Sequence, residues 1–171
     1  MRRIVFVTLL WLLLPACNQD AVRYSTYDSE ALGISFEYPE AWALEANELE
    51  VNVATDESLF AANAAAFNSG AVVNFSSVPL EAIGGDMATA LTQFVNFISA
   101  NEEAEQVGEM ETMVINNHTA VQATVNLGES RTMIVTMIGG NEEAVLIAAV
   151  YDEAQYADML AHVIESVTFA E

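Results

Sequence analysis

Hydrophobic and polar residues alternate along two stretches between residues 24 and 38, and this alternation predicts a β-hairpin. The stretch that begins at Tyr24 and the stretch Ile34–Tyr38 each place aromatic or β-branched residues at every second position. A period of two is typical of a half-buried strand. A polar break followed by Gly33 separates the two stretches. Pro39 lacks a backbone N–H, so we expect it to end the second strand.

Hydrophobic residues three and four positions apart predict two helices. The first is expected to begin after Asp86, whose side chain suits an N-cap, and to end within residues 101–103. The second is expected over residues 153–166. An alanine-rich stretch predicts a further short helix over residues 58–67. The apolar face of the first helix consists of Met87, Leu91, Phe94 and Ile98.

Four runs of β-forming residues between positions 105 and 151 predict an antiparallel meander. Asn116-Asn117 suits a two-residue hairpin, because asparagine tolerates positive φ. Glycine-containing breaks at 128–130 and 139–141 separate the later runs. Further strands are expected over residues 49–53, 70–78 and 167–169.

The first seventeen residues have the pattern of a secretory signal. Arg2-Arg3 precedes an apolar run, Ile4–Leu14, that is too short to span a bilayer. Leu14-Pro15-Ala16-Cys17 then resembles the lipobox of bacterial lipoproteins. The resemblance implies that Cys17 carries a diacylglycerol and becomes the mature N-terminus. The alternative is an ordinary cleaved signal in which this cysteine, the one cysteine of the chain, is incidental.

We therefore expect a signal peptide over residues 1–16, a lipidated cysteine and tether over 17–25, and one folded domain over 26–171. The length of 171 residues and the hydrophobic fraction of 53% fit a single domain with a substantial core. The protein would be anchored to a membrane, in the cell envelope outside the cytoplasm, and would not span the membrane.

The charge balance excludes nucleic acid as an expected partner. Four arginines oppose 25 acidic residues, for a formal net charge of −21, and such a surface repels phosphate backbones. Two causes of the acidity stay open: adaptation to a salty or acidic exterior, or recognition of a basic partner.

Two segments resemble the signatures of PsbP-like domains. The first is Gly33–Trp42, with Phe36, Tyr38, Pro39 and Trp42 as its core residues, and the second is Ile164–Phe169. The resemblance implies an α+β fold in which helices sandwich an antiparallel β-sheet, an α/β/α sandwich.

The functions of PsbP-like domains are diverse. One member is an extrinsic subunit of photosystem II that supports its calcium and chloride requirement, another branch is a Ran-binding nuclear import factor, and many bacterial members are lipoproteins. The resemblance implies a non-enzymatic accessory or binding module of a membrane-associated assembly, with an unknown protein partner and no cofactor. The alternative is a lipoprotein that binds a small ligand or a divalent cation such as calcium and serves a transporter.

Catalytic motifs do not emerge from the sequence. His118 and His162 lack a second histidine or a cysteine at metal-ligand spacing, and no Gly-x-Ser-x-Gly elbow occurs. We therefore expect that the protein is not an enzyme. A cluster of carboxylates is interpreted as solvated surface, because an EF-hand loop is absent, and weak divalent-cation binding is the alternative. The cluster consists of Glu102, Glu103, Glu105, Glu109 and Glu111.

Side-chain alternation predicts that Glu109 and Glu111 share one face of a strand, where Arg131 from a neighbouring strand would be their counter-ion. Phe60, Phe67 and the alanines around them would form a contact patch if exposed. Burial of these phenylalanines against the sheet is the alternative.

Overall fold

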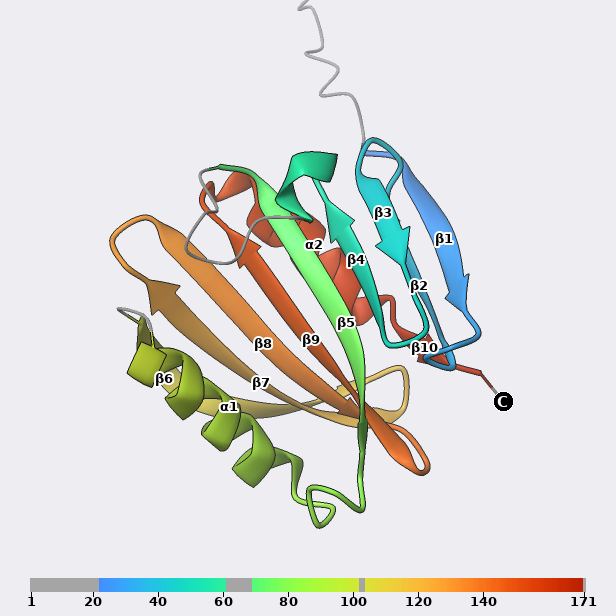
Figure 1. Cartoon of the computed structure of the whole chain (residues 1–171), viewed down its shortest axis with the longest axis vertical. Helices are drawn as coiled ribbons and strands as arrows, with labels where there is room; N and C mark the ends of the chain where they lie inside the picture. Colours follow the sequence, from blue (N-terminus) through green and yellow to red (C-terminus); the bar gives the residue numbers. More distant parts are fainter. Residues whose placement is uncertain (1–21, 61–68, 102–103, 171) are drawn as a thin grey trace, which may run out of the picture.

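A computed structural model describes residues 22–60, 69–101 and 104–170. Its main element is a seven-stranded antiparallel sheet with strand order β3-β4-β5-β9-β8-β7-β6 (Figure 1). A separate three-stranded sheet has the order β1-β2-β10. The strands are β1 (Tyr24–Ser29), β2 (Ile34–Pro39), β3 (Ala43–Ala46), β4 (Glu50–Ala54), β5 (Ala71–Pro79), β6 (Ala104–Ile115), β7 (His118–Leu127), β8 (Arg131–Gly139), β9 (Glu143–Tyr151) and β10 (Thr168–Phe169). The helices are the 3₁₀ turn η1 (Glu57–Leu59), α1 (Met87–Asn101) and α2 (Gln155–Glu165).

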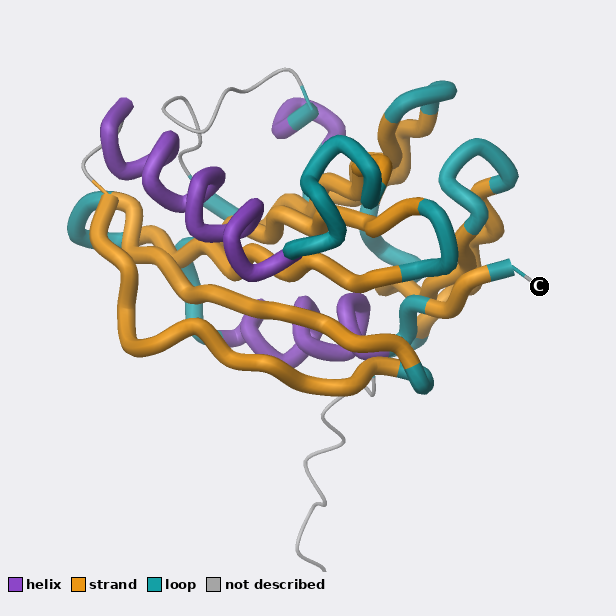
Figure 2. The backbone as a smooth tube through the Cα atoms, turned by 90° about the horizontal axis from the view of Figure 1, so that it is seen from below, coloured by secondary structure: helices purple, strands orange, loops and turns teal. Residues whose placement is uncertain are grey.

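The two long helices cover opposite faces of the large sheet (Figure 2). Helix α1 packs on β6, β7 and β8, whereas α2 packs on β9 and on β2 of the small sheet. We call the face that carries α1 the front face and the other the back face. Each face has its own hydrophobic cluster, one around Leu91 and Val95 of α1 and one around Leu160 and Val163 of α2.

The sequence signals that predict these elements act locally. Asp86 accepts a hydrogen bond from the N–H of Thr89 at 3.0 Å and so caps the start of α1. Asn116 and Asn117 adopt positive φ values of 46° and 69° in the β6–β7 hairpin, as a two-residue turn between twisted strands requires. The two amphipathic helices predicted after Asp86 and over residues 153–166, the hairpins and the β6–β9 meander are confirmed.

The two segments that resemble PsbP-like domains form one structural unit. Thr168 and Phe169 of β10 pair with Ser35 and Ile34 of β2. Beyond this short pairing, the Oγ of Ser166 accepts a hydrogen bond from the N–H of Glu37 at 2.9 Å and donates one to the carbonyl of Val163 at 2.8 Å. Ser166 therefore provides a hydrogen-bond donor for a carbonyl group at the end of α2. It also provides an acceptor for a backbone N–H of β2 that has no strand partner at that position.

Replacing Ser166 with alanine should lower the free energy of unfolding by about 1–3 kcal/mol, because the half-buried N–H of Glu37 loses its acceptor. Denaturant unfolding of the variant measures the loss. Ser130→Ala in the exposed β7–β8 turn is the matched control and should change stability by less than about 0.5 kcal/mol. Equal stability of the two variants would show that this hydrogen bond does not stabilise the fold.

The α+β fold with a large antiparallel sheet and two helices agrees with the prediction, and three details differ. Strand β3 was not predicted, the hairpin β1–β2 belongs to a separate sheet, and the described part of the predicted helix at 58–67 is a single 3₁₀ turn, η1, that begins at Glu57. Of the four signature residues, Phe36 and Pro39 are buried, and Tyr38 and Trp42 pack half-buried against the back-face cluster. Cys17, the tether as far as Ala21, Phe67, Glu102 and Glu103 lie outside the described residues.

Candidate binding face

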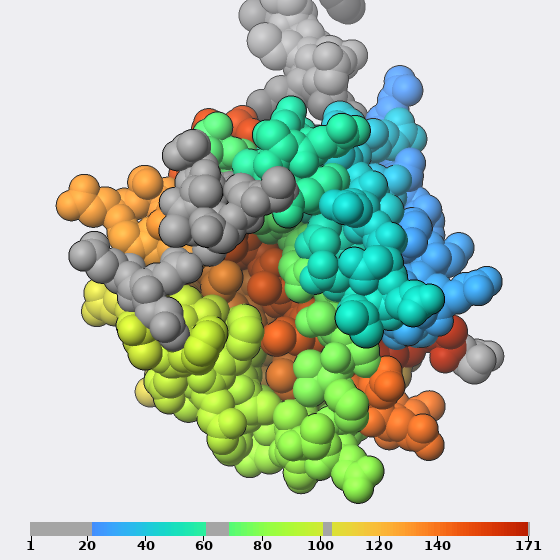
Figure 3. Space-filling view, viewed as in Figure 1, coloured from blue at the N-terminus to red at the C-terminus, as the bar shows by residue number. Residues whose placement is uncertain are grey.

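The front face is hollowed between α1 and the strands β3 and β4 (Figure 3). We call this hollow the front groove, and β5 and β9 form its floor. On the back face, Val145, Ile147 and Ala149 of β9 are at most 1% exposed, whereas Leu146 and Ala148 on the front are half-buried. Strand β5 shows the same difference between its two faces. Helix α1 covers the other half of the front face, so the groove arises because one helix is too narrow to cover seven strands.

Amide and carboxylate side chains form one wall of the front groove. The side-chain Nδ2 of Asn74 donates to Oε2 of Glu50 at 3.0 Å and to Oδ1 of Asn52 at 2.8 Å. Asn47 donates more weakly to Oε1 of Glu50, at 3.4 Å. In the strand register Glu45 pairs with Asn52, and Asn52 pairs with Asn74. Directly paired residues share a face of the sheet, so a polar row crosses β3, β4 and β5.

The opposite side of the groove is bounded by α1, whose apolar side packs on the sheet. Leu91 and Val95 are buried against the sheet, and Phe94 lies half-buried beside them. Close packing holds this side, since a Cβ atom at Gly139 would lie 3.1 Å from the terminal methyl of Met87. The front groove therefore combines a hydrogen-bonding, acidic wall with a floor that includes the half-buried apolar residues Leu146 and Ala148, the mixture that recognition sites use.

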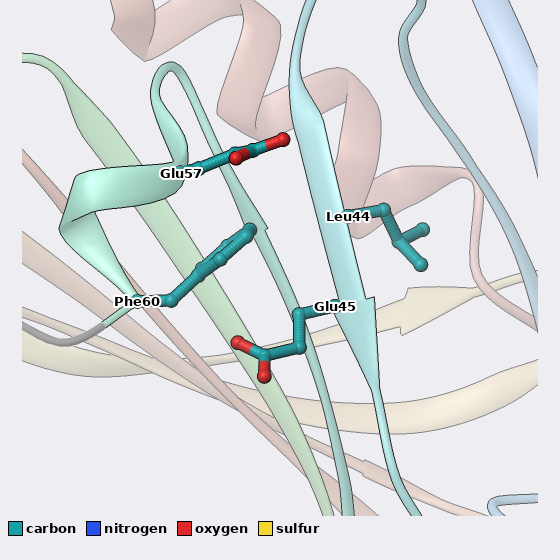
Figure 4. Close-up of a pocket in the computed structure, with 4 residues that line it drawn as sticks. All are labelled: Leu44, Glu45, Glu57 and Phe60. Atoms are coloured by element: carbon teal, nitrogen blue, oxygen red, sulfur yellow. The ribbon is translucent and has the colours of Figure 1, made fainter.

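A pocket with a volume of about 540 Å³ lies at the β3 side of the front face. Leu44 and Glu45 of β3, Glu57 of η1 and the adjoining Phe60 line it. Figure 4 shows the ring of Phe60 pointing toward β3, with the side chain of Glu57 on one side and that of Glu45 on the other. We call it the β3–η1 pocket.

A second polar cluster lies at the junction of β1, β2 and α2. The Nε2 atom of His162 is 2.7 Å from Oε2 of Glu37, and the ring centroids of His162 and Tyr24 are 4.0 Å apart. Both side chains, His162 and Glu37, are more than 40% exposed. Partial burial and, to a smaller degree, the negative charges of Glu37 and Asp158 raise the pKa of the Tyr24 phenol above its usual value. The cluster joins the first strand of the domain to the last helix.

The raised pKa of Tyr24 predicts a loss of stability at alkaline pH. The unfolded chain releases the phenolic proton at a pKa near 10, whereas the folded chain retains it to higher pH. Stability therefore falls as the pH rises above about 10, and Tyr24→Phe should remove this part of the fall. Thermal melts across that range, with phenolate absorbance recorded in parallel, test the prediction. An unchanged alkaline slope in Tyr24→Phe would contradict it.

Solved structures decide the fold. The chain resembles the Ran-binding protein Mog1p of Saccharomyces cerevisiae with a TM-score of 0.59 and 10% identity, over 88% of this chain and 97% of that one. It resembles cyanobacterial PsbP (CyanoP) of Synechocystis sp. PCC 6803 with a TM-score of 0.59 and 14% identity, over 92% and 98% of the two chains. The fold is PsbP-like. A Pseudomonas aeruginosa protein of unknown function, described as a putative regulator, shares it with a TM-score of 0.52 and 10% identity, over 86% and 98%. No family model and no curated protein matches the chain.

The described carboxylates of the candidate cation cluster, Glu105, Glu109 and Glu111, lie on β6, at the edge of the PsbP-like sheet. Glu105, Glu109 and Glu111 are exposed there. A β-bulge between Val107 and Glu111 interrupts the alternation on which their shared face depended. Within residues 22–60, 69–101 and 104–170, no three His, Cys, Asp or Glu side chains form a group that could hold a metal ion. These three glutamates therefore form no such group by themselves.

The expected position of Arg131 beside Glu109 and Glu111 is wrong. Strand β7 lies between β6 and β8, so Arg131 does not begin a strand next to these glutamates. The register aligns Arg131 with Leu127 and Ala104, whereas Glu111 aligns with Gln122 and Thr136.

In the part of the chain that the structure describes, no helix is long and apolar enough to cross a membrane.

Sequence reasoning missed the polar row of the front groove and the β3–η1 pocket. Asn52 lies between the buried Val51 and Val53 of β4, and Asn74 lies between the buried Val73 and Phe75 of β5. Asparagine is unfavourable in strands, so its occurrence on two neighbouring strands was the available signal. Phe60, for which exposure and burial were both open, is half-buried at the pocket.

Proposed function

We propose that this protein is a lipid-anchored accessory module of the cell envelope, outside the cytoplasm, that binds a positively charged protein partner on its front face and catalyses no reaction. The observation that carries the proposal is the difference between the two faces of β5 and β9. The back is buried to 1% exposure or less at Val73, Phe75 and Ile147, whereas the front floor is half-buried. A sheet face of mixed chemistry that its own helix leaves partly uncovered is suited to a partner.

The charge of the molecule favours a basic partner. The chain has 25 acidic residues against four arginines, and its front groove has the carboxylates of Glu45 and Glu50 along one wall. Attraction between opposite charges accelerates association and selects among partners. Mog1p, which shares the fold, is itself named for binding another protein.

The two histidines support a binding role, because both are used in packing. His162 contacts Glu37 and Tyr24, and Nδ1 of His118 is 2.9 Å from the carbonyl of Gly139. The ring of His118 also packs on Phe169 of β10, with ring centroids 4.5 Å apart. These contacts connect α2, the β6–β7 hairpin and β10. Histidine is the residue type most often used in acid–base catalysis, and both histidines make packing contacts instead.

Site-specific photo-cross-linking in native membranes tests the proposal. A photo-reactive residue is placed at Ser76 on the groove floor and, as a matched control, at the exposed Thr26 of β1 in the small sheet. The proposal expects one discrete protein adduct from position 76 that weakens as salt is raised, and none from position 26. The same adducts from both positions, or adducts from position 26 alone, would overturn it.

A further inference from the structure

The β3–η1 pocket has the composition of a receptor for a cationic side chain. Its volume of about 540 Å³ lies within the range of small-ligand pockets. Phe60 supplies an aromatic ring, and Glu45 and Glu57 supply negative charge (Figure 4). Leu44 also lines the pocket, but its side chain points away from Phe60 and packs against the back-face cluster. The aromatic ring lies between the two carboxylate-bearing side chains.

The wall that carries Glu57 and Phe60 has a defined conformation. Asp56 caps η1 by accepting hydrogen bonds from the N–H of Ser58 at 2.9 Å and from its hydroxyl at 2.6 Å. The preceding residue, Thr55, donates its N–H to the carbonyl of Ala71 at 2.9 Å, which fixes the turn to β5. The N–H of Phe60 donates to the carbonyl of Glu57 at 3.2 Å. The pocket therefore needs little reorganisation before it binds.

The carboxylates of Glu45 and Glu57 differ from that of Glu50, on the polar wall of the front groove, in their hydrogen-bond partners. The carboxylate of Glu50 accepts hydrogen bonds from Asn47 and Asn74. The carboxylates of Glu45 and Glu57 have no hydrogen-bond or ion-pair partner among the residues that the structure describes. Two like charges beside an aromatic ring repel each other, and a cation bound between them would relieve the repulsion.

We propose that the β3–η1 pocket binds the guanidinium group of an arginine side chain from the partner protein; this inference rests on the proposed function. A guanidinium ion stacks on an aromatic face and donates hydrogen bonds to carboxylates at its edges. A calcium ion fits less well, because it needs six to eight oxygen ligands and the ring of Phe60 offers none.

Titration of the ¹⁵N-labelled full-length chain in non-ionic detergent with N-acetyl-arginine amide tests the pocket directly. We expect saturable amide shifts concentrated at residues 44–45 and 57–60, with a millimolar dissociation constant. The neutral isostere N-acetyl-citrulline amide should cause no saturable shift. Equal binding of citrulline amide or of N-acetyl-lysine amide would overturn the assignment to a guanidinium.

Variants separate the pocket from the general acidity of the surface. The double variant Glu45→Gln/Glu57→Gln should weaken arginine-amide binding at least tenfold, and Phe60→Leu should weaken it several-fold without changing the charge. The control Glu81→Gln/Glu165→Gln removes the same charge from exposed positions elsewhere and should leave binding within twofold. Equal weakening by the two double variants would show diffuse attraction and overturn the pocket.

The pocket and the proposed function can fail separately. If the adduct from position 76 persists in Glu45→Gln/Glu57→Gln with undiminished yield, the front face binds a partner without the pocket, and this inference is overturned. If arginine amide binds the pocket but no adduct forms from position 76, the pocket is real and the proposed function is wrong.

Discussion

Replacing Phe36 with alanine should lower the free energy of unfolding by about 3–5 kcal/mol, a large part of the stability of a domain of this size. Phe36 is 1% exposed. Its ring stacks on Phe75 with centroids 4.1 Å apart and planes inclined by 18°. Phe36 comes from β2 of the small sheet and Phe75 from β5 of the large sheet, so this stack joins the two sheets. Denaturant-induced unfolding followed by circular dichroism measures the loss.

Three further variants make this prediction specific. Phe36→Leu retains most of the apolar volume and should lose less stability than the alanine variant, which keeps the test informative if Phe36→Ala does not fold. Val114→Ala, at a site that is 71% exposed, should change stability by less than about 0.5 kcal/mol. A double-mutant cycle with Phe75→Leu should give a coupling of about 0.5–1.5 kcal/mol. Zero coupling, or equal effects of Phe36→Ala and Val114→Ala, would contradict the stacked junction.

The sequence predicted the elements whose signals are local. Helix α1 was found because its apolar spacing and the Asp86 cap lie within one stretch of chain, and the β6–β7 hairpin was found because Asn116-Asn117 is a turn signal in itself. Strand β3 was missed because its four residues, Ala43–Ala46, have weak β-propensity. It forms a strand because it pairs with β4, and such tertiary context overrides local preference.

The division into two sheets depends on contacts between distant parts of the chain. The hairpin β1–β2 is completed by β10, whose residues Thr168 and Phe169 are near the other end of the sequence. Local periodicity cannot specify which strand pairs with which. The resemblance to PsbP-like domains identified one signature segment near each end of the domain. The hydrogen bond from the N–H of Glu37 to Ser166 joins the two segments, so both contribute to packing.

The candidate site was less predictable than the fold, because its residues come from separate strands. The row from Glu45 to Asn74 exists only in one register of β3, β4 and β5, and a shift of one residue would turn every side chain to the other face. The glutamates at 102–111 are close in sequence, but the described ones form no metal-binding group. Strand register instead brings together Glu45, Asn52 and Asn74, which are far apart in the sequence.

Replacing Cys17 with serine should move the protein from the membrane fraction to the soluble fraction, if the lipobox resemblance reflects lipidation. Each buried methylene of an acyl chain contributes about 0.8 kcal/mol, so a diacylglycerol anchor accounts for stable attachment by itself. The first described residue, Val22, is five positions beyond Cys17. An extended chain spans at most about 3.6 Å per residue, so an anchored domain would lie within about 18 Å of the lipid attachment.

Membrane fractionation after a high-salt wash, combined with metabolic labelling by an alkyne fatty acid, measures this change. The wash removes protein that is retained only by a charged partner, since salt screens such contacts. Gln19→Ala, in the expected tether, is the matched control and should stay labelled and membrane-bound. Retention of unlabelled Cys17→Ser in the washed membranes would contradict the lipid anchor and make protein contacts the means of attachment. Loss of the label with release into the soluble fraction would identify Cys17 as the residue that anchors the protein to the membrane.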